Sequence, residues 1–183
     1  MLRSFLKFAL TSMIGFCLIG SSQAFAASKA EIDIEVKQAI KRFKKEVGAA
    51  DEYMKIAKGM LVFPSVFKAG FGIGGEYGEG ALLIGGKTVQ YYSTAAASFG
   101  FQLGAQTKTI IILFTTSDAL KKFRKSDGWE AGVDGSVALV DIGAAKTIDT
   151  NTIKNPIIAF VISNKGLMYN LSLEGSKYTK IDR

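Results

Sequence analysis

The chain has 183 residues, with 23 Lys and Arg against 16 Asp and Glu, one cysteine and no histidine. That length suits a single domain. Without histidine the chain lacks the side chain most often used as a general base, and a transition metal would depend on carboxylate ligands. We therefore expect no catalytic residue, no cofactor and no metal site.

Residues 1–26 have the features of a secretory signal peptide. Arg3 and Lys7 give a basic start, residues 8–19 form an uncharged apolar run, and Ala24-Phe25-Ala26 matches an A-x-A cleavage site. The apolar run is too short to span a bilayer comfortably. We expect cleavage after this site and a periplasmic or secreted bacterial protein that can associate with the membrane. An uncleaved membrane anchor is the alternative.

Cleavage there would leave residues 27–183 as one domain, with 21 basic and 16 acidic side chains and a net charge of +5. The only cysteine, Cys17, lies before the cleavage site, so the mature protein could form no disulfide within itself. A basic domain favours anionic partners. Export makes nucleic acid an unexpected partner.

Residues 28–47 predict an amphipathic helix. Ser28 and Glu31 have the spacing of a capping box. The apolar face follows the helical period and carries Ile32, Val36, Ile40, Phe43 and Val47. The roughly opposite face is basic and carries Lys37, Lys41, Lys44 and Lys45. Ile34 stands among these lysines, where an interfacial helix places a residue that touches acyl chains.

This helix has two interpretations that are compatible with each other. Its apolar face docks on a core, and its lysines either point into solvent or contact the phosphates of an anionic membrane. Lys37, Lys41 and Lys45 are four residues apart and repel one another mildly. An anionic surface would relieve that repulsion.

A second, shorter helix is expected over residues 49–58, ended by Gly59. Residues 60–63 predict a short strand that Pro64 stops. Aromatic bulk surrounds this proline, from Phe63, Phe67 and Phe71. These rings fit either a core or a hydrophobic lip that enters a bilayer. In the second case Phe67 is our candidate for insertion.

Residues 57–86 hold nine of the 20 glycines. Gly70, Gly72 and Gly74 alternate with bulkier residues, so a strand here has one bare face. Such a strand is expected where another backbone approaches closely, as in a tightly closed barrel or under a helix. The stretch also matches GxGxxG, but strand-like sequence follows the match, where a dinucleotide site needs a helix.

The rest of the chain predicts strands and one more helix. Strands are expected over 81–84, 88–91, 99–105, 108–116, 131–142, 156–162, 167–173 and 178–181, with a hairpin turn at 164–166. Residues 117–125 predict a helix capped by Ser117 or Asp118, with Leu120 and Phe123 turned inward.

The outward face of this last helix is basic, with Lys121, Lys122, Arg124 and Lys125. This second cluster fits a solvated helix end, where the helix dipole favours cations. Trp129 follows it and fits either a core residue or an interfacial anchor.

Two groups of acidic residues are candidates for acid–base chemistry or calcium binding. Glu76 and Glu79 are three residues apart and fit two exposed side chains better than an acid–base pair. Asp127, Glu130 and Asp134 lack the ordered spacing of an EF-hand loop.

Three ordered segments resemble the SYLF domain. They are AKGMLVFPSVFKAGFGIGGEYGEGALL from Ala57, SFGFQLGAQ from Ser98 and SNKGLMYNLSLEGSKYTKID from Ser163. The resemblance spans about residues 30–182. It implies helices before a glycine-rich β core, with lipid binding by the region before that core. It also implies binding of phosphoinositides or other anionic lipids in eukaryotic members, whereas bacterial members look like secreted single-domain versions.

The expected fold is α+β, with two N-terminal helices packed on a glycine-rich, mainly antiparallel sheet curled into a flattened barrel. The expected function is non-enzymatic binding of anionic phospholipid at the bacterial cell envelope. The candidate lipid-binding residues are Lys37, Lys41, Lys44, Lys45, Ile34 and Phe67. The alternative is an envelope or stress protein that binds a protein partner through a sheet edge or the aromatic lip.

Overall fold

The computed structural model describes residues 27–100, 106–140, 152–163 and 173–183, without the side chains of 70–73 and 98–100. The expected signal peptide, with its cleavage site, lies outside the described residues. So do most of the strand expected over 99–105 and nearly all of the hairpin expected over 164–173.

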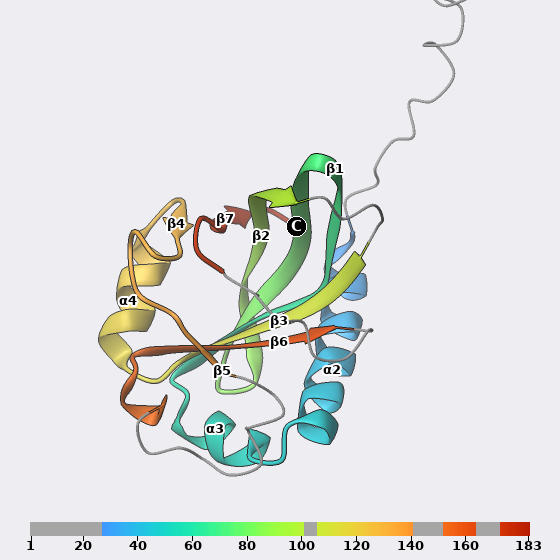
Figure 1. Ribbon diagram of the computed structural model, residues 1–183. Helices are drawn as coiled ribbons and strands as arrows, with labels where there is room; N and C mark the ends of the chain where they lie inside the picture. Colours follow the sequence, from blue (N-terminus) through green and yellow to red (C-terminus); the bar gives the residue numbers. More distant parts are fainter. Residues whose placement is uncertain (1–26, 101–105, 141–151, 164–172) are drawn as a thin grey trace, which may run out of the picture.

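The described residues form helices and one sheet (Figure 1). The helices are α2 (Lys29–Glu46), α3 (Ala50–Ile56) and α4 (Ser117–Lys125), with a 3-10 turn at Thr152–Lys154. The strands are β1 (Gly59–Ile84), β2 (Lys87–Gly100), β3 (Gln106–Phe114), β4 (Trp129–Glu130), β5 (Ala138–Val140), β6 (Ile157–Ser163) and β7 (Lys177–Ile181).

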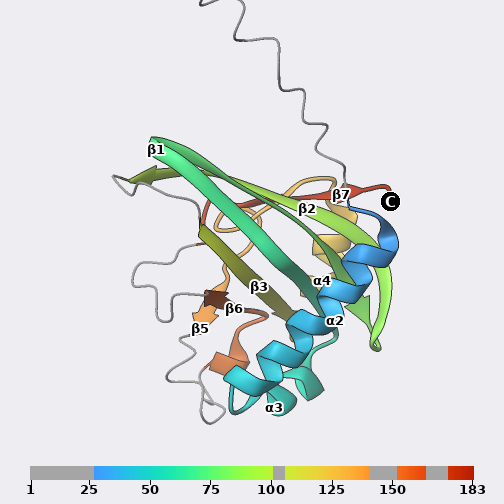
Figure 2. The same cartoon turned by 90° about the vertical axis from the view of Figure 1, so that its right-hand side faces the viewer.

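The strand order is β4-β7-β2-β1-β3-β6-β5. Neighbouring strands are antiparallel except for β5 and β6, which are parallel. The sheet curls into a half-barrel (Figures 1 and 2). The expected α+β class and mainly antiparallel sheet are therefore confirmed, and the expected flattened barrel is a half-barrel.

The longest strand, β1, belongs to both halves of the sheet. Residues 59–68 pair with β3 and residues 72–84 pair with β2, and the strand bends over between them at the top of Figure 1. The expectation that Pro64 ends a strand is wrong. The register shifts between Phe63 and Val66, so the proline lies in an irregular step of the ladder, where its missing N–H is tolerated.

Gly78 and Gly80 allow the two halves of β1 to approach each other. A Cβ on Gly80 would lie 2.1 Å from the carbonyl oxygen of Val62, and one on Gly78 would lie 2.8 Å from that of Ser65. Only glycine leaves room for a backbone this close. The expected close approach of another backbone is present, but at Gly78 and Gly80, which follow the glycines of the GxGxxG match in β1. Those glycines are followed by strand up to Ile84, not by the helix of a dinucleotide site.

Apolar clusters cover both faces of the sheet. α2 and α3 pack on what we call the outer face, against Val62, Ile111 and Phe160. α4 packs on the inner face, where Leu120 and Phe123 join the second cluster. Viewed from the side, α2 crosses in front of the sheet and α4 lies behind it (Figure 2). The two helices therefore lie on opposite faces.

Two local expectations are wrong. Over the described residues 131–140, the strand expected at 131–142 is reduced to β5, because a turn intervenes in which Gly132 has a φ of +86° and its N–H donates to the carbonyl of Gly135 at 3.0 Å. The N-cap of α4 is Thr116, not Ser117 or Asp118. The Thr116 hydroxyl accepts a hydrogen bond from the N–H of Ala119 at 3.2 Å.

The bend of β1 gives a stability test. Gly80→Ala should lower the free energy of unfolding by about 3 kcal/mol, because its Cβ would collide with a backbone carbonyl that cannot move aside cheaply. Gly75→Ala in the same strand is the control, since its nearest neighbour lies 3.9 Å from the added Cβ. Urea unfolding of both variants measures the difference. Equal stability of the two would contradict the close approach.

Candidate functional site

The start of α2 is fixed by its first turn. The Ser28 N–H donates to the Glu31 carboxylate at 2.7 Å, and the Glu31 N–H donates to the Ser28 hydroxyl at 3.3 Å. This reciprocal capping box is the one that the sequence predicts. The hydrogen bonds from Ser28 hold the pKa of the Glu31 carboxyl below its usual value. The carboxylate is thus maintained at the helix N-terminus, where the helix dipole favours it.

The rotation of α2 about its axis is fixed by its buried face and by both flanks. Its buried side chains are Ile32, Val36, Ala39 and Phe43, and the Phe43 ring meets Phe160 edge-on at 4.8 Å between centroids. On one flank the Asp33 carboxylate accepts hydrogen bonds from Thr88 and Tyr91. On the other, Arg42 donates to the carbonyl of Ser163 at 3.2 Å. These contacts leave the helix one orientation on the sheet.

That orientation turns the predicted lysines to the surface. Lys37, Lys41, Lys44 and Lys45 are all exposed, and 55% of Ile34 is accessible. The helical period places Ile34 between Lys41 and Lys45 when the helix is viewed down its axis. The structure thus brings Ile34 and the lysines of α2 together on one solvent-facing surface, which we call the α2 basic face.

One lysine of this face already has a partner. Lys44 Nζ lies 2.7 Å from the Asp51 carboxylate at the start of α3. The hydrogen bond from Lys44 is the main cause that holds the pKa of Asp51 below its usual value. Lys44 is therefore less available to an external anion than Lys37, Lys41 and Lys45.

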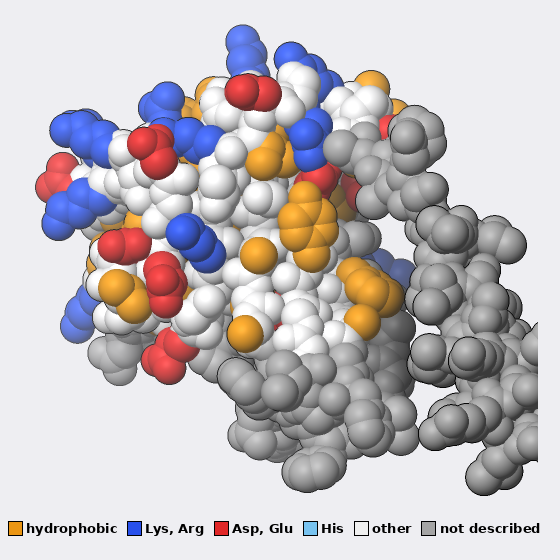
Figure 3. All heavy atoms as spheres, turned by 90° about the horizontal axis from the view of Figure 1, so that it is seen from above, with side chains coloured by type: hydrophobic (Ala, Val, Ile, Leu, Met, Phe, Trp, Pro, Cys, Tyr) orange, Lys and Arg blue, Asp and Glu red, His pale blue; other side chains and the backbone are white. Residues whose placement is uncertain are grey.

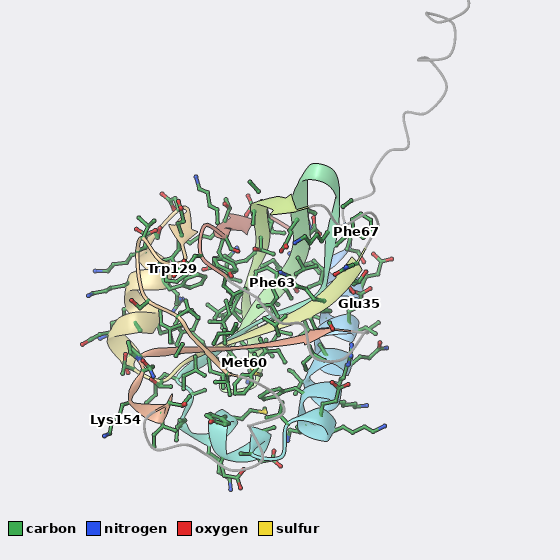
Figure 4. The ribbon with its side chains drawn as sticks, in the orientation of Figure 1. Glu35, Met60, Phe63, Phe67, Trp129 and Lys154 are labelled. Atoms are coloured by element: carbon green, nitrogen blue, oxygen red, sulfur yellow. The ribbon has the colours of Figure 1, made fainter. Side chains whose placement is uncertain are left out.

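Phe67 is exposed, as expected for a lip residue, but it comes from another element. It follows Val66, which is buried on the inner face, so Phe67 points to the outer face of β1. Figure 4 shows it above Glu35, at the upper end of the sheet. Tyr77, in the other half of β1, is equally accessible at 51%. Phe67 thus comes from the bent strand β1, whereas Ile34 comes from α2.

The second predicted basic cluster is also exposed. Lys121, Lys122, Arg124 and Lys125 surround α4 on its solvent side, and Leu120 and Phe123 hold the helix to the inner face. Trp129 is 4% accessible and packs edge-on against Phe123 at 5.7 Å between ring centroids. Of the two roles left open for Trp129, the structure selects the core residue.

The inner face holds an ion-pair cluster that the sequence did not reveal. Lys108 Nζ lies 2.6 Å from one carboxylate oxygen of Glu76, and Lys68 Nζ lies 3.5 Å from the other. The Lys108 side chain is 7% accessible and that of Glu76 is 11% accessible. Three strand segments contribute, since Lys68 and Glu76 lie on either side of the bend in β1. The cluster therefore joins both halves of β1 to β3.

A signal for this cluster exists in hindsight. Side chains alternate between the two faces of a strand, so Lys108 lies on the same face of β3 as Ile110 and Ile112, which are buried on the inner face. A charged residue on the buried face of a strand needs a partner of opposite charge. The alternation in β3 therefore indicates that Lys108 is paired, although it does not indicate with which carboxylate.

A buried phenol completes the polar part of the inner face. Burial raises the pKa of Tyr178 well above its ordinary value, the Ser176 and Thr94 hydroxyls act in the opposite direction, and the Glu76 carboxylate adds to the increase. Tyr178 is therefore a neutral phenol at physiological pH. Its ring packs on Phe63 at 5.5 Å between centroids, so the phenol is part of the core.

Glu76 and Glu79 do not converge on one site. Side chains alternate along β1, which places Glu76 on the inner face and Glu79 on the outer face. The Glu79 carboxylate forms an ion pair with Arg183 and accepts a hydrogen bond from Tyr77. The expectation that both glutamates are exposed is wrong, since both carboxylates are largely buried in ion pairs. The two have no common substrate position.

The acids near Trp129 are part of a turn. The Asp134 carboxylate accepts a hydrogen bond from the Glu130 N–H at 2.7 Å, and Asp127 pairs with Lys180 at 3.3 Å.

In the part of the chain that the structure describes, no helix is long and apolar enough to cross a bilayer.

A protein-family model described as Ysc84, Las17-binding protein actin regulator, matches residues 95–182. No curated protein matches the chain. The matched region starts near the end of β2 and contains α4, but it does not include α2 or β1. The resemblance seen in the sequence is thus supported over the second half of the chain, and the α2 basic face lies before the matched region.

The ion-pair cluster predicts unequal effects of its members on stability. Glu76→Gln should lower the free energy of unfolding by about 3 kcal/mol or more, because it leaves two ammonium groups without a carboxylate. Lys108→Met should cost about 1 kcal/mol, because Lys68 still pairs with Glu76. Chemical denaturation of both variants measures the difference.

The matched control for this test is Lys68→Met, which removes the more exposed and more distant of the two lysines. Its effect should be the smallest of the three. If Lys108→Met proved as damaging as Glu76→Gln, then Lys68 would not compensate for its loss.

Proposed function

We propose that the protein, whose residues 95–182 match the SYLF (Ysc84) family model, binds anionic phospholipid at the bacterial cell envelope. Binding is non-enzymatic and uses the α2 basic face. Lys37, Lys41 and Lys45 contact lipid phosphates, Lys44 contributes when it leaves Asp51, and Ile34 enters the acyl region. The protein acts in the periplasm or outside the cell after its leader is removed.

The observation that carries this proposal is the fixed orientation of α2. Its apolar face and both flanks are used by the sheet, so Lys37, Lys41, Lys45 and Ile34 make no ion pair or core contact among the described residues and are left to contact a partner. An exposed isoleucine among lysines is the pattern of a helix that lies in a membrane interface.

The strength of this contact follows from the number of charges. Each lysine near an anionic membrane contributes about 1 kcal/mol. Three lysines without an ion pair among the described residues, together with one exposed isoleucine, should give weak, reversible binding that high salt suppresses. Phosphatidylglycerol and cardiolipin are the anionic lipids we expect in a bacterial envelope, in place of phosphoinositides.

A second candidate function is binding of a protein partner. The name of the family model refers to Las17 binding and actin regulation, and we do not transfer those partners to this chain. The exposed rings of Phe67 and Tyr77 on the outer face of β1 favour an apolar contact with a protein of the envelope. Such a contact would survive high salt, whereas the lysine contact would not.

Co-sedimentation with vesicles tests the lipid proposal. Protein purified after export should bind vesicles that contain phosphatidylglycerol at low salt, and should bind phosphatidylcholine vesicles much less. Lys37→Glu/Lys41→Glu/Lys45→Glu should weaken binding at least tenfold, because three attractive charges become repulsive.

The matched control is Lys58→Glu/Lys87→Glu/Lys154→Glu, which makes the same change in net charge at three exposed lysines outside α2. Equal loss in both variants would show that only net charge matters. No binding of the wild type at low salt would reject the lipid proposal.

The Lys44–Asp51 ion pair predicts a variant that binds better. Asp51→Asn should strengthen binding to phosphatidylglycerol vesicles about threefold, because it frees Lys44 and removes one nearby negative charge. Glu52→Gln removes a negative charge from the neighbouring position, which forms no ion pair with Lys44. If both variants gain equally, the release of Lys44 contributes nothing.

A further inference from the structure

The two basic surfaces of this protein face in opposite directions. α2 covers the outer face of the sheet and α4 covers the inner face, and each helix turns its cations away from the sheet. In Figure 1 the two helices stand at opposite sides of the molecule, and in Figure 2 one lies in front of the sheet and the other behind it. A single flat surface that touches one helix does not touch the other.

The cations of α4 are free to bind an external anion. None of Lys121, Lys122, Arg124 and Lys125 forms an ion pair within the residues that the structure describes. The nearest acids along the chain are Asp118, in the first turn of α4, and Asp127, which pairs with Lys180. Seen from above, basic side chains project from the α4 side of the molecule (Figure 3).

Screening separates the two surfaces electrostatically. Two helices of about 10 Å diameter on either side of one sheet layer place the basic faces roughly 30 Å apart. The Debye length at physiological salt is about 8 Å. A membrane under α2 therefore exerts almost no attraction on the lysines of α4, which remain available to a second surface.

We infer that the protein bridges two anionic membranes, with the α2 basic face on one and α4 on the other. This inference rests on the proposed function, because α2 supplies the first contact. The α4 contact is the weaker one, since no exposed large apolar residue stands among its cations. Binding to one vesicle is then governed by α2, and the joining of two vesicles requires both helices.

The experiment separates binding from bridging. Co-sedimentation measures binding to vesicles of phosphatidylglycerol and phosphatidylcholine, and energy transfer between two dye-labelled populations of the same vesicles measures clustering. Wild-type protein should do both. Clustering should rise and then fall as protein is added, because an excess of monomer covers every vesicle separately.

Lys121→Glu/Lys122→Glu/Lys125→Glu should bind within about twofold of wild type and should lower clustering at least tenfold. The α2 variant Lys37→Glu/Lys41→Glu/Lys45→Glu should lose both. The control Lys58→Glu/Lys87→Glu/Lys154→Glu should keep both, and circular dichroism confirms that each variant is folded.

Three outcomes would overturn the inference. Wild-type protein that binds without clustering would leave the proposed function intact and reject bridging. Clustering that persists in the α4 variant would assign it to association between protein molecules on the membrane. Absence of any binding by the wild type would reject the proposed function, and bridging with it.

Discussion

The close contact between the two halves of β1 is the constraint on which the rest of the structure depends. Gly80 lies against the backbone of Val62, and the strand can bend back on itself only because neither Gly78 nor Gly80 carries a side chain. The bend lets one strand pair with β2 on one side and β3 on the other. Both faces of the resulting curved sheet then require a cover, which the helices provide.

The charged residues of the inner face support the same bend. The Glu76 carboxylate forms ion pairs with Lys68 from the other half of β1 and with Lys108 from β3. One carboxylate therefore connects three strand segments at the point where the sheet curves. On the outer face, Asp33 and Arg42 on opposite flanks of α2 bind Thr88 of β2 and Ser163 of β6. These half-buried polar contacts fix the orientation of α2, and that orientation determines where its lysines point.

Local patterns predicted local features well. Ser28 and Glu31 identified the start of α2, and the lysine spacing correctly placed Ile34 on the exposed side. Features that depend on distant partners were missed. The strand continues past Pro64 because β3 accommodates the irregular step, and the carboxylate that pairs with Lys108 lies 32 positions earlier in the chain, beyond the reach of any periodic pattern. The spacing of the lysines did not indicate that Lys44 forms an ion pair with Asp51.

The hydrogen bonds on the two flanks of α2 have a consequence for the thermodynamics of association. Many amphipathic segments are disordered in solution and fold on a membrane, which costs about 2–5 kcal/mol of ordering free energy. Here the helix is already formed, capped and fixed against Thr88, Tyr91 and Ser163. The surface that α2 presents is therefore preorganised, and the binding proposed above should leave the helical content of the protein unchanged. A preorganised surface needs fewer charges for a reversible contact than a segment that must first fold.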